Sequence, residues 1–591
     1  MAEERPGVAV SLIRAIVVSP ASAEALNQLA LAVLRTGQHI PALQILVRSL
    51  AVRRDLAETH LNCGGVLFEL AEWDQAIGCY ERALEFRPDY AEAHANRAGA
   101  LQSLGRVDEA RPGYERALAL NPGHTDAHAN LATLDQASGD TAAAIRRFKR
   151  ALSIDPRRPQ IHSNLLFTLT YAENVDDEAI YRAFRDWERR HAQPLYAEAR
   201  PHDNDRDPDR RLKVGYLSAD LRDHPVAHNL IASLERHDRR EVELTLYALL
   251  PGGDEMTERF RGIAERWRWV GGQDEHRIAA QIREDRIDVL VMMAPHTADN
   301  RPLVAALKPA PVQVALYDLT TTGMAAVDAW ITDPLIHPPG ETTERFVETL
   351  IRVPCLVNHA APSPSPPLVR PPSAVRGRVT FGSFNNPAKV TDRVIALWAE
   401  VLDAVPGSRL LLKYLSRYGS PEMARLIGDR FAAHGIGPDR LELRSGRLPR
   451  MAQLALLNEV DIALDPFPFN GCTTTFEALW MGVPVVTLEG SRFLGRMSGS
   501  FLRHVGLGDL VAGDAAAYVG VATGLAGDLD RRSALRRELR DRLLASPLCD
   551  ADAHARSLVA AYRRLWRDWC SGTPSGSSPL SAAPARYKPS T

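Results

Sequence analysis

The pattern of apolar positions divides the chain into two kinds of segment. Up to about residue 175, apolar residues recur with the spacing of amphipathic helices, and Gly or Pro separates one helical stretch from the next. From about residue 211, short apolar runs alternate with helical stretches. That alternation is typical of parallel sheets covered on both faces. The sequence therefore predicts an α-helical array followed by two α/β lobes with doubly wound parallel sheets.

The helical part repeats with a period of 34 residues. Pro88, Pro122 and Pro156 are separated by 34 positions each, and small and aromatic residues recur with the same period. Each unit contains two amphipathic helices and ends at the proline, which cannot continue a helix. These units are tetratricopeptide repeats, with full copies over 57–90, 91–124 and 125–158 and a degenerate copy over 23–56. Such repeats stack into a superhelix with a concave surface.

Two polar positions keep this period. They are occupied by His60, His94, His128 and His162, and two residues later by Asn62, Asn96, Asn130 and Asn164. An amide both donates and accepts hydrogen bonds, so a column of amides along a groove can bind the backbone of an extended acceptor peptide. The alternative is a run of surface amides without a partner.

Composition suggests six segments. We predict a repeat domain over 1–175, a linker over 176–210, a first lobe over 211–358, a Pro-rich connection over 359–378, a second lobe over 379–570 and a disordered tail over 571–591. Two doubly wound lobes in series place a ligand cleft between them, outside the carboxyl ends of the strands.

Three local patterns indicate chemistry. In DIALDPFPFNGCTTTFEALW a strand leads to a helix that starts near Thr473, and Thr474 with Glu477 matches a capping box, so the helix start suits a diphosphate. Lys389 follows the strand of VTFGSFNN and is predicted to point into the cleft. His224 follows the first strand of the first lobe and is a candidate proton acceptor. The alternatives are an ordinary capped helix, a solvated lysine and a structural histidine.

Charge and cysteine usage narrow the class of protein. The net charge is only −2, and the Lys and Arg residues are spread along most of the sequence. Binding of nucleic acid or an anionic membrane surface is therefore not expected. The six scattered cysteines lack zinc-site or disulfide-scaffold spacing, which favours a reducing compartment. The start of the chain does not have the pattern of a signal peptide, and no apolar run is long enough for a spanning helix. A cytoplasmic protein is expected.

Taken together, the segments resemble the O-linked N-acetylglucosamine transferase family, including its bacterial members and the plant SPINDLY branch. The repeats are followed in order by GYLSADLRDHPVAH, FGSFNNPAK and DPFPFNGCTTTFEALWMGVPVVTL, and the resemblance extends to about residue 568. It implies a two-lobed glycosyltransferase B fold and inverting, metal-independent transfer of a sugar from a nucleotide donor such as UDP-N-acetylglucosamine. It also implies a Ser/Thr acceptor protein in the repeat groove, with flagellin among the candidates.

The resemblance also assigns roles to individual residues. It makes His224 a proposed general base and Lys389 the catalytic contact to the donor diphosphate. The remaining donor contacts are Thr473 and Thr474 at the phosphates, Glu477 at the ribose, Arg450 at the nucleobase, and Asn386 in place of a glutamine. The asparagine column corresponds to the family's acceptor-holding ladder.

Two departures from the family concern the donor. Cys472 replaces a histidine before the threonine pair, and the loop Tyr317 to Gly323 is shorter than its counterpart. A thiol is a weaker hydrogen-bonding group than an imidazole, so the donor pocket is expected to discriminate differently. Other donors, such as GDP-fucose or a sugar used on flagellin, stay open, and so does a catalytically weak repeat scaffold.

Overall fold

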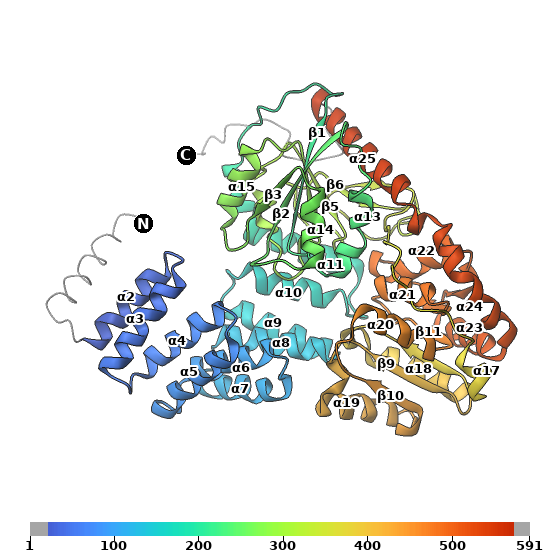
Figure 1. The fold of residues 1–591 in the computed structure, drawn as a ribbon, viewed down its shortest axis with the longest axis horizontal. Coiled ribbons are helices and arrows are strands. Elements are labelled where there is room, and N and C mark those ends of the chain that lie inside the picture. The colour runs from blue at the N-terminus through green and yellow to red at the C-terminus, as the bar shows by residue number, and fades with distance from the viewer. Residues whose placement is uncertain (1–21, 573–591) are drawn as a thin grey trace, which may run out of the picture. The chain divides into compact units, whose positions relative to one another are not determined.

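The computed structural model describes residues 22–572, and these form two compact units (Figure 1). The first unit contains residues up to 136 together with 143–156, and the second contains 137–142 together with the chain from 157 onward. Most of the predicted disordered tail, from 573 to 591, and the first 21 residues lie outside the described residues. Each unit is described below by itself.

The first unit consists of antiparallel helix pairs. The helices are α2 (Ala23–Leu34), α3 (His39–Val52), α4 (Ala57–Glu69), α5 (Trp73–Phe86), α6 (Ala91–Ser103), α7 (Val107–Leu120), α8 (Thr125–Ala137) and α9 (Thr141–Ile154). Each predicted repeat copy corresponds to one pair. The residues that recur in the sequence form the core, since Ala83, Ala117 and Ala151 are completely buried. The predicted helical repeat array is confirmed.

The recurring histidines close the turn that precedes their own repeat. The imidazole Nε2 atoms of His60, His94 and His128 lie 2.9, 2.9 and 3.1 Å from the carbonyl oxygens of Arg54, Pro88 and Pro122, six residues earlier in each case. A carbonyl at the end of a helix has no partner within that helix, so the imidazole N–H satisfies it. These three histidines therefore have a local structural role, whereas Nδ1 of His162 lies 3.1 Å from Nε2 of His191.

The second unit begins with α10 (Pro159–Leu169) and α11 (Asp177–Trp187), which precede the first lobe. The strands of that lobe are β1 (Leu212–Ser218), β2 (Val242–Ala248), β3 (Arg266–Trp269), β4 (Val289–Met293), β5 (Val312–Leu316), β6 (Ala329–Thr332) and β7 (Thr349–Arg352). The helices are α12 (Pro225–His228), α13 (Ile231–Leu234), α14 (Glu255–Ile263), α15 (Glu275–Glu284) and α16 (Leu303–Ala306). The strands form one parallel sheet in the order β3-β2-β1-β4-β5-β6-β7.

The second lobe has the same construction. Its strands are β8 (Thr380–Ser383), β9 (Arg409–Lys413), β10 (Leu441–Arg444), β11 (Ile462–Leu464), β12 (Val485–Leu488) and β13 (Val511–Ala512), and they form a parallel sheet in the order β10-β9-β8-β11-β12-β13. Its helices are α17 (Pro372–Arg376), α18 (Asp392–Ala404), α19 (Pro421–Ala432), α20 (Arg450–Leu456), α21 (Thr473–Trp480), α22 (Met497–His504), α23 (Ala515–Gly527) and α24 (Leu529–Leu544). The two predicted doubly wound lobes are thereby confirmed.

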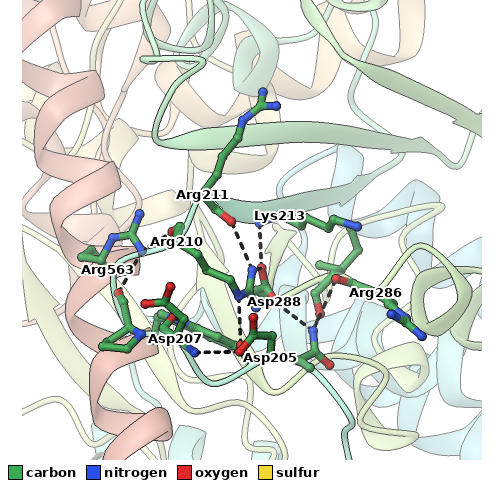
Figure 2. Close-up of polar contacts among 12 residues, drawn as sticks. Asp205, Asp207, Arg210, Arg211, Lys213, Arg286, Asp288 and Arg563 are labelled. Carbon is green, nitrogen blue, oxygen red and sulfur yellow. Dashed lines mark hydrogen bonds and ion pairs between the residues drawn. The ribbon is translucent and has the colours of Figure 1, made fainter.

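The last helix, α25 (Ala551–Ser571), leaves the second lobe and packs along the first (Figure 1). The buried hydroxyl of Tyr562 on α25 lies 2.8 Å from that of Tyr216 on β1. Figure 2 shows the contact at the start of the first lobe, where Arg563 donates to the backbone carbonyl of Arg210. The guanidinium of Arg210 in turn forms a two-bond ion pair with buried Asp288 at 2.6 and 2.7 Å.

Within residues 22–572, each helix is too short or too polar to cross the hydrocarbon core of a membrane.

Candidate functional site

The strand order reverses between β8 and β11 in the second lobe, and the candidate residues follow these two strands. Lys389 comes after β8, and Thr473 opens α21 after β11. Ligands of doubly wound sheets bind at such a reversal, outside the carboxyl ends of the strands. The sequence-predicted residues of the second lobe therefore lie at the position where this architecture places a ligand.

In the turn before α21, side-chain oxygen atoms crowd the position of Gly471. A Cβ atom on Gly471 would lie 2.4 Å from Oγ1 of Thr475 and 2.9 Å from Oδ1 of Asp465. The Gly471 N–H donates to the same Asp465 oxygen at 2.8 Å, and the Thr487 hydroxyl donates to the other at 2.7 Å. Burial nevertheless raises the pKa of Asp465 to about 6. This carboxyl fixes the turn that delivers the chain to the helix.

The predicted capping box at this helix is wrong. The helix starts at Thr473 as expected, but the residue in the cap position is Cys472, whose side chain makes no capping bond. Thr474 lies inside the first turn and its hydroxyl donates to Oδ1 of Asn385 at 2.9 Å. Since Asn385 follows β8, the threonine ties the two halves of the reversal point together. Glu477 has no capping role, and burial raises the pKa of its carboxyl to about 7.

Lys389 is held in place by the same turn. Its Nζ donates to the carbonyl oxygen of Asn470 at 2.6 Å and lies 4.0 Å from the ring centroid of Phe469. Burial lowers the pKa of Lys389 to about 8, and this is opposed by the charges of Asp465 and Cys472. A poorly solvated ammonium group that bonds one carbonyl retains two further N–H donors for an anion.

Several buried polar atoms around this turn have no hydrogen-bond partner among the described residues. They include Oγ1 of Thr473 and Oδ1 of Asn470. A small pocket next to them is lined by Asn385, Asp465 and Thr474, among others. Buried polar groups are normally paired, so unpaired ones next to a helix start indicate a site for a polar ligand. The free N–H groups and dipole of α21 favour an anionic one.

On the first lobe, His224 caps the short helix α12. Its Nδ1 accepts from the Val226 N–H at 3.3 Å, and Oδ1 of buried Asp220 lies 3.3 Å from the same nitrogen. One nitrogen cannot accept from Val226 and donate to Asp220 at once, so the tautomer decides which bond forms. With the proton on Nδ1, the Nε2 lone pair is free to accept a proton. Burial lowers the pKa of His224, against the charge of Asp220.

The residues after His224 contact the second lobe. Nη1 of Arg450 lies 2.9 Å from Nδ1 and 2.8 Å from Nε2 of the His228 ring, and the same Nε2 lies 2.9 Å from Oδ1 of Asp223. Nδ2 of Asn229 donates to Sγ of Cys472 at 3.5 Å. The structure therefore brings Arg450 and Cys472 against the helix that His224 caps. Burial raises the pKa of the Cys472 thiol to about 11.

In the loop Tyr317 to Gly323, Thr321 and Thr322 are hydrogen-bonded within the protein. The hydroxyls of Thr321 and Thr322 both donate to the buried carboxylate of Glu348. Gly323 has φ +74°, and a Cβ there would lie 2.6 Å from the carbonyl oxygen of Phe184 on α11. Backbone approach of this kind excludes any side chain at Gly323. Because Thr321 and Thr322 donate to Glu348, their hydroxyl protons are not available to a ligand.

The remaining predicted residues, Asn386 and the four asparagines of the column, do not lie together. Oδ1 of Asn386 accepts from the Ala388 N–H at 3.2 Å and so caps the turn that carries Lys389. In the first unit, Asn62 donates to Oδ1 of Asn27 at 2.9 Å, Asn130 contacts the Tyr114 hydroxyl, and Asn96 is exposed. Asn164 belongs to the second unit, where it accepts from Gln160 at 3.3 Å.

Four residues of this site were given no role from the sequence. They are Asp220, Asn229, Asn385 and Asp465, each within two residues of the end of a strand or a short helix. Position after a strand was the available signal, but an Asp or Asn there is equally typical of a turn.

Comparison with known proteins agrees with this architecture. Glycosyl transferase family 41 matches residues 190–357 and 373–558, and tetratricopeptide-repeat families match residues 64–105 and 101–166. The chain is 38% identical over 413 residues to the "probable UDP-N-acetylglucosamine–peptide N-acetylglucosaminyltransferase SPINDLY" of Petunia hybrida, covering 69% of this chain and 44% of that protein. The protein of the same name from Arabidopsis thaliana is 38% identical, with 69% and 45% covered. The chain thus spans less than half the length of these relatives.

A solved structure gives the same result over more of the chain. A mutant of the Thermobaculum terrenum O-GlcNAc transferase superposes with a TM-score of 0.82 at 34% sequence identity, covering 87% of this chain and 98% of that one. The match therefore includes both the repeat region and the two lobes. Because the family pattern covers well over half of the residues, the chain belongs to glycosyl transferase family 41.

Proposed function

We propose that this chain is a protein O-glycosyltransferase that moves a sugar from a nucleotide-sugar donor to Ser or Thr hydroxyls of acceptor proteins held by the repeats. The observation that carries the proposal is the set of groups at the reversal point of the second lobe. Lys389, the start of α21 and the unpaired oxygens of Thr473 and Asn470 converge there. Groups of this kind bind a diphosphate and stabilise the charge that develops on it as it leaves.

The proposed reaction is a single displacement. The acceptor oxygen bonds to the anomeric carbon while the bond from that carbon to the diphosphate breaks, which inverts the carbon. Lys389 and the α21 N–H groups neutralise the leaving diphosphate, so the displacement assigns no role to a metal ion. The acceptor proton passes to Nε2 of His224, whose opposite nitrogen faces Asp220. Holding donor and acceptor together supplies much of the rate enhancement.

The donor's nucleoside is assigned to the groups between the lobes. Arg450 is proposed to contact the nucleobase, and Glu477, free of a capping role, to contact the ribose. Asn386 acts here through the turn that holds Lys389. The acceptor protein is assigned to the concave side of the repeats, with Asn62, Asn96, Asn130 and Asn164 as backbone contacts.

N-acetylglucosamine is the proposed sugar because the SPINDLY relatives carry that activity in their names. A specific observation favours a second donor. Cys472 bonds Asn229 of the opposite lobe through sulfur, a weak acceptor, where an imidazole is expected from the family resemblance. GDP-fucose and other activated sugars are therefore the alternative donors, with the same mechanism.

The test is a donor panel with the purified full-length chain. Turnover and thermal shift are measured with UDP-N-acetylglucosamine, GDP-fucose and CMP-linked sugars, with flagellin and a total protein extract as acceptors. Turnover with one donor and glycosylated Ser or Thr in the product, found by mass spectrometry, would support the proposal. Donor binding without any transfer or hydrolysis would instead identify a catalytically weak scaffold. The Lys389→Ala variant serves as the inactive control.

A further inference from the structure

Three side chains with metal-binding atoms meet between the lobes, and none of them belongs to the proposed donor site. Asp333 follows β6 and Cys355 follows β7, both in the first lobe, and His504 is the last residue of α22 in the second. Their ligand atoms all lie within 4.8 Å of one another, and among the described residues no other such group of three or more has this geometry. The three residues are about 22 and 150 positions apart along the chain, so the folded lobes alone bring them together.

Backbone hydrogen bonds fix the direction of the Asp333 carboxylate without any metal ion. Its Oδ1 accepts from the backbone N–H groups of Leu335 and Ile336 at 2.9 Å each, and its Oδ2 accepts from the Leu356 N–H at 3.1 Å. Each carboxylate oxygen can accept more than one bond, so Oδ2 keeps a free position. Hydrogen bonds to a metal-ligating carboxylate fix its direction and are a regular part of metal sites.

The histidine provides an independent observation. Nε2 of His504 is buried and has no hydrogen-bond partner among the described residues. An unpaired ring nitrogen out of contact with water is costly, because neither a donor nor a solvent molecule satisfies it. Coordination of a metal ion would satisfy it.

We propose that Asp333, Cys355 and His504 bind one zinc ion that joins the two lobes. The Cys355 thiol donates to the Val357 carbonyl at 3.2 Å, so it carries its proton in this structure. On binding, a zinc–sulfur bond forms, the S–H bond breaks, and the proton goes to solvent. One divalent cation, one thiolate and one carboxylate sum to zero charge, which suits the burial of Asp333 and Cys355.

The ligand types select the metal. Thiolate and imidazole favour zinc over magnesium or calcium, which prefer oxygen ligands alone. Three protein ligands leave the fourth tetrahedral position to water. Because Asp333 and Cys355 come from one lobe and His504 from the other, the ion would stabilise the arrangement of the lobes as they stand here.

The test titrates the full-length chain, freed of any affinity tag and stripped of metal, with cobalt(II) and then with zinc. Cobalt serves as the probe because its bond to a thiolate gives a near-ultraviolet absorption band. One equivalent should bind with that band, zinc should displace it, and zinc should raise the melting temperature. Cys355→Ser should lose the band, and His504→Gln should bind at least about tenfold more weakly, as loss of a supporting group already costs that much.

Cys570→Ser is the matched control, because it removes a thiol on α25 remote in sequence from the three ligands and should leave the band unchanged. The melting temperature of each variant without metal shows whether it has folded. Absence of cobalt binding by the unchanged protein would overturn the proposal. So would a thiolate band that persists in folded Cys355→Ser.

Discussion

The repeat unit and the two-lobed unit differ in how far apart along the sequence their hydrogen-bonded polar residues lie. In the repeats, His60, His94 and His128 each bond a carbonyl six residues earlier. In the lobes, Lys389 bonds a residue 81 positions away, and the Arg450 to His228 and Asn229 to Cys472 contacts span 222 and 243 positions. The comparison indicates that the periodic histidines stabilise their own repeats, whereas irregularly placed polar residues of the lobes contribute to the candidate site.

The largest effect is expected from Lys389→Ala. Removing the cation that faces the leaving diphosphate should lower kcat by about 100-fold or more, as for other groups that stabilise developing charge. Steady-state transfer assays with the donor that the panel selects measure this. The variant should keep its circular dichroism spectrum, since Lys389 makes a single hydrogen bond. A rate above about one tenth of the original, a loss near 1.4 kcal/mol, would contradict the assigned role.

The next-largest expected effect is a fall of kcat/KM at alkaline pH. Burial lowers the pKa of Lys389 to about 8, so the group loses its positive charge as pH rises through that value. We expect kcat/KM to fall about tenfold per pH unit above about 8, because kcat/KM reports groups of the free enzyme. Lys389→Arg is the control and should not show this alkaline decline, since a guanidinium stays charged throughout this pH range. If both proteins show the same alkaline decline, another group is responsible.

A smaller effect is expected in the repeats, where substitution of the asparagines tests whether they bind the acceptor or only stabilise the fold. Asn96→Ala combined with Asn130→Ala should raise KM for a protein acceptor about 30-fold, at roughly 1 kcal/mol for each lost hydrogen bond. Hydrolysis of the donor without acceptor should be unchanged, because that reaction needs only the lobes. The pair of rates is measured on one preparation. Equal loss in both would show that these amides only maintain the fold.

The smallest effect separates two neighbours on one helix. His94→Ala removes the bond to the Pro88 carbonyl and should destabilise the turn before α6 by about 1 kcal/mol, a roughly fivefold faster hydrogen exchange. Asn96→Ala, two residues later on an exposed position, should leave exchange unchanged. Hydrogen exchange with mass spectrometry over residues 87–104 measures both. Identical exchange in the two variants would remove the distinction between the histidine and asparagine columns.

Much of the fold was predictable because its signals are local. The period of 34 gave the helix pairs, and apolar runs such as those of β1, β4 and β5 gave the central strands, which are buried on both faces. Two of the edge strands, β3 and β13, escaped prediction. β3 has the sequence RWRW with partly exposed side chains, and β13 has two residues. Strands of that kind lack the apolar run that marks a central strand.

The site was predictable only where a residue type is unusual for its position. A lysine after β8 and a threonine run after β11 stand out, whereas Asp465 and Asn385 resemble ordinary turn residues. The capping-box prediction failed for a physical reason. The Thr474 hydroxyl donates to Asn385, which follows β8 and lies 89 positions earlier in the chain. This tertiary contact takes the place of the local capping bond that the sequence pattern favours.

The return of α25 to the first lobe has a consequence for biosynthesis. The Tyr216 to Tyr562 contact closes a loop of 346 residues, and Arg563 covers the backbone just before β1. During translation the first lobe emerges early, yet this part of its surface stays uncovered until the last helix has left the ribosome. Long-range closure of this kind is slow and exposes apolar surface meanwhile. The first lobe is therefore expected to depend on chaperones until synthesis reaches α25, and to aggregate when expressed without it.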